Sequence, residues 1–115
     1  MSQNPDKLVV IWISGDKEIA VNMAFMYALN SRLREWWQEV TLVIWGPSAK
    51  VLANEDELKP YIKKMLDAGV EITACKACTD NYGVSAQLKD LGIKVIYMGE
   101  PLTNYLKEGT RVLTV

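Results

Sequence analysis

Two short stretches decide the fold, Leu8-Val-Val-Ile-Trp-Ile13 and Val40-Thr-Leu-Val-Ile-Trp45. Both are rich in β-branched residues and almost continuously apolar. Such runs are typical of strands buried on both faces, as in a parallel sheet covered by helices. Three further runs predict additional strands, at Val70–Ala74, Ile93–Met98 and Arg111–Val115. The sequence therefore predicts a sheet of five strands.

Helices are predicted between these strands. Asp16 can cap a helix that runs to about Trp37, with acidic residues at its start and basic ones near its end. Three shorter helices, each closed by a glycine, are predicted in 60–69, 85–92 and 101–109. The alternation of strand and helix predicts an α/β domain of three α/β/α layers, with a mostly parallel sheet and flavodoxin-like layering.

Length and composition narrow the class of protein. The 115 residues fit one domain, 1–115. The 13 Lys and Arg residues against 14 Asp and Glu give a net charge of -1, which argues against nucleic-acid binding. The sequence contains no histidine, which excludes Ser-His-Asp and Cys-His catalysis and every histidine-containing zinc site.

We also expect neither a membrane segment nor a secretory signal. The longest apolar stretch, Ile19–Leu29, is about half the length that crosses a bilayer. The start, Met1–Lys7, lacks the layout of a signal peptide, and two cysteines are too few for a disulfide scaffold. We therefore expect a soluble cytoplasmic protein that contacts no membrane.

The first predicted helix is apolar on both faces. Between Ile19 and Leu29 its single polar residue is Asn22, whereas a helix on a sheet needs one apolar stripe. Either a longer loop covers the second face or another subunit does. The tryptophans at its end, Trp36 and Trp37, favour a subunit contact. We expect a homo-oligomer, with Met26 as a candidate for the outer face.

The sequence has one constellation with obvious reactivity, Cys75-Lys76-Ala77-Cys78. Cys75 ends a predicted strand, and ligands and catalytic groups gather at the carboxyl ends of strands in α/β sheets. If the next helix starts near Thr79, its amide groups point toward the thiols. Those amides and Lys76 favour the thiolate.

The residues after the motif leave the details open. Thr79, Asp80 and Ser85 are alternative caps for the helix, and Asp80 disfavours the thiolate. Three interpretations remain for the cysteines. They can be small buried hydrophobic residues, or zinc ligands completed by carboxylates or a second subunit, or reactive thiols that form a persulfide, a reversible disulfide or both. We expect no metal and no cofactor.

Other features have simpler interpretations. Ser14-Gly15-Asp16 is interpreted as a helix cap rather than a phosphate loop, because the glycine-rich turn is missing. The acidic run 55–57 is interpreted as a solvated loop. Trp12 and Trp45 are expected in or near the core, where one of them could line a pocket at the strand ends.

Four segments together suggest a known family. They are Lys7-Leu-Val-Val-Ile-Trp-Ile13, Val43-Ile-Trp-Gly46, Gly69-Val-Glu-Ile-Thr-Ala-Cys75 and Tyr105-Leu-Lys-Glu-Gly-Thr-Arg-Val-Leu-Thr-Val115. These segments resemble the DsrE/TusD-like sulfur-relay family, small α/β proteins that carry sulfane sulfur on a cysteine. Together they cover most of the chain.

The resemblance implies roles for particular residues. The sulfur-carrying cysteine of the family corresponds to Cys75, and Gly83 keeps the family's spacing of eight positions. Cys78 is similar to a second cysteine of a YchN-like subset. Tyr82 stands where the family usually has arginine, so Lys76 is the candidate replacement. Lys76 and Gly83 are thus implied substrate-binding residues.

The resemblance also implies partners. We expect sulfur donor or acceptor proteins and a homotrimer or homohexamer. The leading hypothesis is a persulfide carrier or transferase that acts through Cys75, with Cys78 as a possible resolving thiol. The alternative is a non-enzymatic oligomeric module that binds a small ligand or a protein.

Overall fold

A computed structural model describes residues 6–115. Its five strands form one all-parallel sheet with the order β4-β3-β2-β1-β5, which confirms the predicted fold class. The strands are β1 (Lys7–Trp12), β2 (Glu39–Ile44), β3 (Glu71–Cys75), β4 (Lys94–Ile96) and β5 (Arg111–Thr114). The expectation about a signal peptide rests mostly on residues 1–5, which lie outside the described residues.

One long helix follows β1. It consists of α1 (Lys17–Ile19), a π-helical segment η1 (Ala20–Phe25) and α2 (Met26–Leu33). The predicted cap is confirmed, because the Asp16 carboxylate accepts a hydrogen bond of 2.8 Å from the Glu18 amide. The predicted end at Trp37 is wrong. The chain turns at Glu35, whose φ of 58° lies in the left-handed region, so both following tryptophans lie beyond the helix.

The remaining helices are short. They are α3 (Pro47–Asn54), a 3-10 turn η2 (Asp56–Leu58), α4 (Lys59–Asp67), α5 (Lys76–Tyr82), α6 (Ser85–Asp90) and α7 (Gly99–Lys107). The sequence analysis did not predict α3. The expected acidic loop is partly helical, and Lys17 bonds the carboxylates of Glu55 and Glu57 at 3.2 and 2.9 Å.

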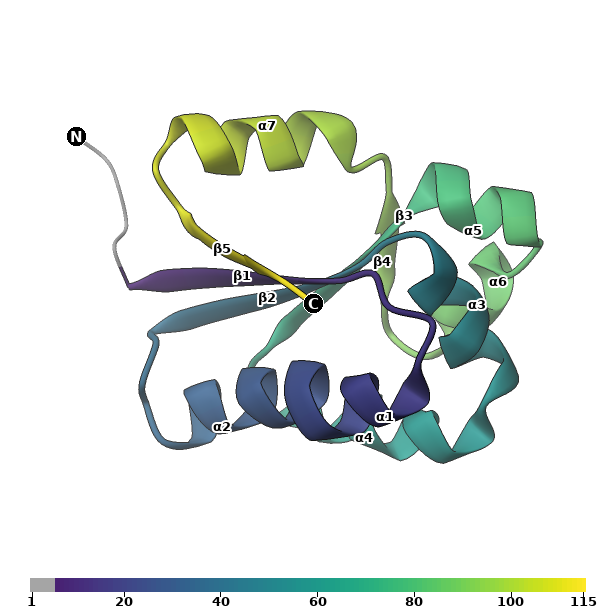
Figure 1. The fold of residues 1–115 in the computed structure, drawn as a ribbon, viewed down its shortest axis with the longest axis horizontal. Helices are drawn as coiled ribbons and strands as arrows, with labels where there is room; N and C mark the ends of the chain where they lie inside the picture. The colour runs from purple at the N-terminus through teal and green to yellow at the C-terminus, as the bar shows by residue number, and fades with distance from the viewer. Residues whose placement is uncertain (1–5) are drawn as a thin grey trace.

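The strand order explains where the helices lie. Parallel strands are joined by right-handed crossovers, so a change of direction across the sheet moves the connecting helix to the opposite face. From β1 to β4 the chain advances in one direction, with α1, α2 and α4 on one face (Figure 1). From β4 it returns past three strands to β5, and this connection carries α7 over the other face.

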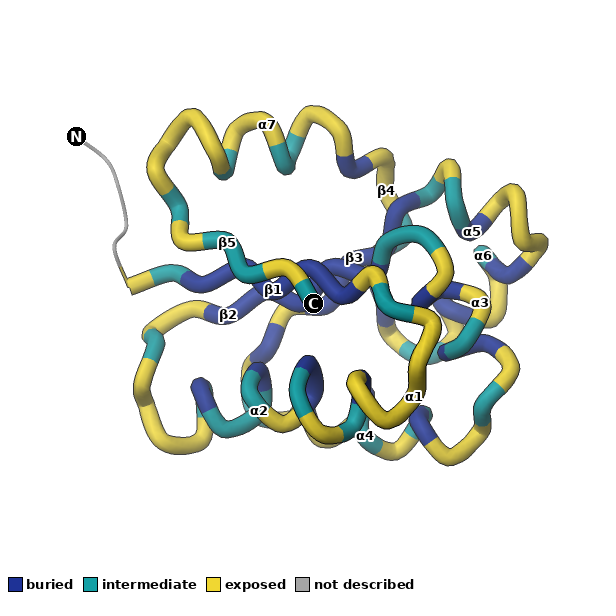
Figure 2. Tube along the Cα trace, in the orientation of Figure 1, coloured by how far each residue is buried: buried dark blue, intermediate teal, exposed yellow. Residues whose placement is uncertain are grey.

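The two faces are therefore covered unequally. The larger core lies under α1, α2 and α4, where Trp12 meets Phe25 edge to face at 4.9 Å between ring centroids. The smaller core, under α7, contains Val9, Ile11, Val43, Cys75 and Met98. Within 99–107, α7 contains no fully buried residue (Figure 2). The sheet face that carries Cys75 is thus the more open one.

None of the helices in residues 6–115 combines the length and apolar character that crossing a bilayer requires.

Candidate functional site: a thiol pair at the end of β3

Cys75 lies at the carboxyl ends of two neighbouring strands, which are followed by connections that run in different directions. It is the last residue of β3 and pairs with Ile96, the last residue of β4. The chain leaves β3 toward α6, whose Leu88 packs in the larger core, whereas it leaves β4 toward α7 on the opposite face. Open α/β sheets bind their ligands at such switch points. Cys75 is buried, with 5% of its surface exposed.

Cys78 lies one helical turn further along the chain. It is the third residue of α5, it is half-buried, and it packs beside the apolar cluster that contains Cys75. Both cysteines are free thiols. Cys75 lies deeper and is fixed by the sheet, while Cys78 is more accessible.

The surroundings of Cys78 raise the pKa of its thiol. Burial raises the pKa of Cys78, the backbone of Gly46 lowers it through a hydrogen bond, and a side-chain hydrogen bond with Cys75 raises it again. The overall direction is upward, so Cys78 stays protonated at neutral pH.

The start of α5 differs from the sequence-based expectation. The helix begins at Lys76 rather than near Thr79, and Cys75 itself occupies the N-cap position with φ −70° and ψ 115°. Neither Thr79 nor Asp80 caps the helix. Cys75 is therefore the residue at which β3 ends and α5 begins.

The two charged side chains of α5, Lys76 and Asp80, form an ion pair. Lys76 bonds Asp80 at 2.6 Å and lies 5.4 Å from the centre of the Tyr97 ring. Asp80 also accepts a bond of 2.5 Å from Ser85, and the Ser85 hydroxyl is 2.7 Å from that of Thr79. The ion pair lowers the pKa of Asp80. The opposing charge of Asp80, which the sequence suggested would act on the thiols, is thus offset by Lys76.

Gly83 has a clear place in the backbone. It ends α5 with φ 70°, in the left-handed region that favours glycine, and a side chain added there would meet nothing within 4 Å. The eight positions from Cys75 to Gly83 therefore run from the N-cap to the C-cap of α5, which has seven residues. The substrate-binding role that the resemblance implies for Gly83 stays a prediction.

A row of apolar side chains flanks Cys75 on the open face. Ile44 pairs with Ala74 and Cys75 with Ile96, so Trp45, Cys75 and Ile96 follow one another across the carboxyl edge. Ile96 is 40% exposed. Next to this row lies an apolar pocket of about 300 Å³, lined by Ile11, Ile13, Trp45, Gly46, Leu102 and Thr114. A tryptophan at such a pocket was suggested by the sequence. The positions of Gly46 and Leu102 in the lining were not predicted, because no local sequence pattern marks them.

The comparison with protein families decides what kind of protein carries this site. Residues 7–115 match the model of the DsrE/DsrF-like family. The chain belongs to the DsrE/DsrF-like family. This confirms the resemblance noted in the sequence, and it covers all five strands and both cysteines.

Solved structures agree with the assignment to the DsrE/DsrF-like family. A conserved protein of unknown function from Bacteroides thetaiotaomicron, BT1422, is 44% identical with a TM-score of 0.93, and the alignment covers 96% of this chain and 95% of that one. The ychN protein of E. coli and MTH1491 of Methanobacterium thermoautotrophicum, a protein of unknown function, are each 17% identical, with TM-scores of 0.74 and 0.73. Each alignment covers 95% of this chain and 98% of the other, and shows the fold alone. No protein with a curated description matches the chain.

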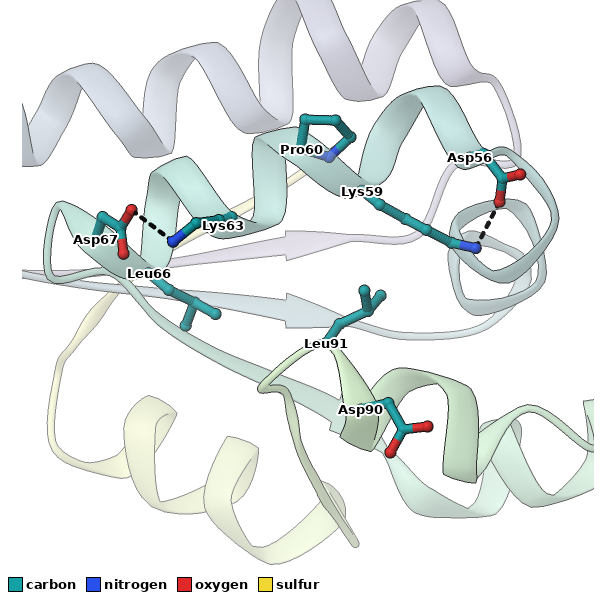
Figure 3. Close-up of a pocket in the computed structure, with 8 residues that line it drawn as sticks. All are labelled: Asp56, Lys59, Pro60, Lys63, Leu66, Asp67, Asp90 and Leu91. Atoms are coloured by element: carbon teal, nitrogen blue, oxygen red, sulfur yellow. Dashed lines mark hydrogen bonds and ion pairs between the residues drawn. The ribbon is translucent and has the colours of Figure 1, made fainter.

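A larger surface pocket lies elsewhere in this DsrE-like chain. It has a volume of about 710 Å³ and lies between α4 and the end of α6, with Leu66 and Leu91 inside a charged rim (Figure 3). Lys59 and Lys63 on this rim are paired with Asp56 and Asp67. Its lining contains neither cysteine. Within residues 6–115, no three acidic or cysteine side chains gather closely enough to hold a metal ion.

Proposed function

We propose that this DsrE-like protein carries sulfane sulfur on Cys75 and that Cys78 is the resolving thiol. The observation that carries the proposal is the pair of interacting free thiols at the carboxyl end of β3, in a chain of the DsrE/DsrF-like family. One thiol is held by the sheet and the other by the first turn of α5. Membership of the family supports a role of the sulfur-relay type.

Loading needs one thiol. The Cys75 thiolate attacks the outer sulfur of a donor persulfide, R–S–SH. The S–S bond of the donor breaks, Cys75–S–SH forms, and the donor leaves as the thiolate RS⁻. An acceptor thiolate then takes the outer sulfur in the same way and regenerates Cys75. The Cys75 thiolate is the nucleophile of the first step and the leaving group of the second.

Resolution needs both thiols. The Cys78 thiolate attacks the inner sulfur of Cys75–S–SH, which forms a Cys75–Cys78 disulfide and releases HS⁻. A reducing dithiol must then reopen the disulfide. Because the pKa of Cys78 is raised, this reaction is slow at neutral pH, and the persulfide survives long enough to be passed on.

The experiment is to incubate the reduced protein with inorganic polysulfide and to measure its intact mass and that of its peptides. The proposal predicts the gain of one sulfur atom on the peptide that contains Cys75, removed by a thiol reductant. An unmodified protein would contradict it.

We further propose that the protein acts as a homo-oligomer, a trimer or hexamer, in the cytoplasm. Ile19, Met26 and Leu33 lie seven residues apart along the first helix and are 40%, 48% and 61% exposed. A regular row of exposed apolar side chains on one helix is suited to a subunit contact. Free thiols suit a reducing compartment. The same surface also favours the second candidate function, an oligomeric module that binds a ligand or protein without transferring sulfur.

A further inference from the structure

The apolar pocket beside the thiol pair has a distinct chemistry. Six residues line it. None of them is charged, and Thr114 supplies the one hydroxyl group. Its residues come from the ends of β1, β2 and β5 and from α7. Helix α7 covers this face of the sheet, and Ile13, which lines the pocket, is 42% exposed.

Neither cysteine lines the pocket, but the pocket and the thiols share neighbouring residues. Trp45 and Leu102 line the pocket and also pack against the cluster that contains Cys75 and beside which Cys78 lies. Gly46 lines the pocket, and its backbone is hydrogen-bonded to Cys78. A molecule seated in the pocket would therefore lie against the same residues as a sulfur atom bound at the pair.

Size and polarity restrict what fits. A volume of about 300 Å³ lies at the lower end of small-molecule sites, which suits one aromatic ring or a short branched chain. A carboxylate or ammonium group in this pocket would lose water without meeting an opposite charge in the lining, and such burial is costly.

We propose that this pocket holds the organic group of the small thiol or persulfide that exchanges sulfur with Cys75, and that this group is apolar and uncharged. The inference rests on the proposed function and names its substrate class. It makes charged thiols poor substrates for the protein. The pocket selects the R group, and the thiol pair performs the exchange.

Thiol–disulfide exchange provides a direct test, in a Cys78→Ser background where Cys75 alone can react. The Cys75 thiolate attacks one sulfur of an aromatic disulfide, the Cys75–S–S–aryl bond forms, and the aryl thiolate leaves. The protein thiol is oxidised as the reagent is reduced. The neutral reagent is dithiodipyridine and the dianionic one is dithiobis(nitrobenzoate). β-Mercaptoethanol corrects for their intrinsic reactivity.

After this correction, we expect the protein to prefer the neutral reagent by about tenfold, because the dianion is desolvated in the pocket. Ile13→Lys should remove or reverse the preference. Gln87→Lys is the matched control, since it adds the same charge at an exposed position of α6 that does not line the pocket, and it should change nothing. Equal corrected rates, or equal effects of the two lysine variants, would overturn the proposal.

A second measurement separates the pocket from the sulfur chemistry. Thioanisole, a neutral aryl sulfide that cannot exchange, is titrated into the Cys75→Ser/Cys78→Ser protein and followed by amide NMR. We expect saturable shifts at Gly46 and Thr114. Failure of sulfur loading together with these shifts would remove the proposed function alone. Loading without these shifts would overturn the pocket inference, and so would dissociation of an oligomer by Ile13→Lys, which would make a second copy of the chain the occupant.

Discussion

Cys75 and Ile96 form the last residue pair between β3 and β4, and the connections that follow these strands place α6 and α7 on opposite faces of the sheet. This arrangement follows from the strand order, and it places the thiol pair between the two connections. The reactive thiol is fixed by the sheet, while its partner Cys78 lies on the helix that starts there. The geometry of the pair is therefore set by backbone topology and does not depend on a long side chain.

The first prediction concerns the pH dependence of resolution. The pKa of Cys78 is raised, so the Cys78 thiolate becomes abundant only above the usual range of a thiol. The rate at which loaded protein releases sulfide should therefore increase as the pH rises through that raised value. A sulfide electrode measures this rate. In Cys78→Ser protein this increase should disappear, and its persistence would contradict the assignment of Cys78.

The second prediction concerns Gly83. The φ of Gly83 is 70°, a backbone conformation that is strained for a residue with a β-carbon. Gly83→Ala should therefore lower the free energy of unfolding by about 1 kcal/mol. Gly83→Asn should cost less, because asparagine tolerates the left-handed region better. Denaturant unfolding measures both. The rate of sulfur loading on the same variants tests the substrate-binding role, since a loss of loading that both variants share would exceed what helix termination explains.

The third prediction concerns an ion pair at the other end of β3. Lys94 bonds Glu71 at 3.0 Å and lowers the pKa of its carboxyl group. A carboxyl pKa that is lower in the folded state stabilises the fold above its unfolded value, about 4.3, and this contribution is lost as the pH falls through the folded value. The Glu71 side chain is 44% exposed, so solvent screening limits the gain.

Lys94→Gln should therefore reduce stability by about 0.5 kcal/mol at neutral pH, and the difference from the native protein should vanish in acid. Urea unfolding at several pH values measures this difference. A constant difference across the whole range would show that Lys94 acts through packing of its aliphatic stem rather than through its charge.

The fourth prediction concerns assembly. Met26 is 48% exposed at the centre of the row formed with Ile19 and Leu33. Met26→Glu should dissociate the oligomer at micromolar concentration, because a buried unpaired carboxylate is costly. Sedimentation velocity measures the effect. Gln87→Glu makes the same charge change on exposed α6 and should leave the assembly intact. A native protein that sediments as a monomer would refute the oligomer.

The sheet could be predicted because its strands are buried on both faces. That burial produces the apolar runs around Val10 and Leu42, and all five strands overlap the predicted segments. The end of the first helix could not be predicted, because the chain stops it by placing Glu35 in a left-handed conformation that no glycine signals. Helix α3 was missed because it starts at Pro47 directly after the strand and has a weak apolar stripe.

The reactive motif could be predicted from spacing, but its surroundings could not. Cys75 and Cys78 are neighbours along the chain, so their proximity follows from sequence. The apolar pocket is assembled from four separate segments, and the role of Gly46 depends on how β2 lies beside β3. Such a site forms only when the strand order is fixed.

The central claim is that Cys75 carries the sulfur. The most direct measurement is the intact mass of three proteins, native, Cys75→Ser and Cys78→Ser, after incubation with inorganic polysulfide and removal of the excess. The account predicts that Cys75→Ser gains no sulfur, and that Cys78→Ser gains one atom and keeps it longer than the native protein. Loading of Cys75→Ser, with none on Cys78→Ser, would reverse the roles. Equal behaviour of all three proteins would contradict the account.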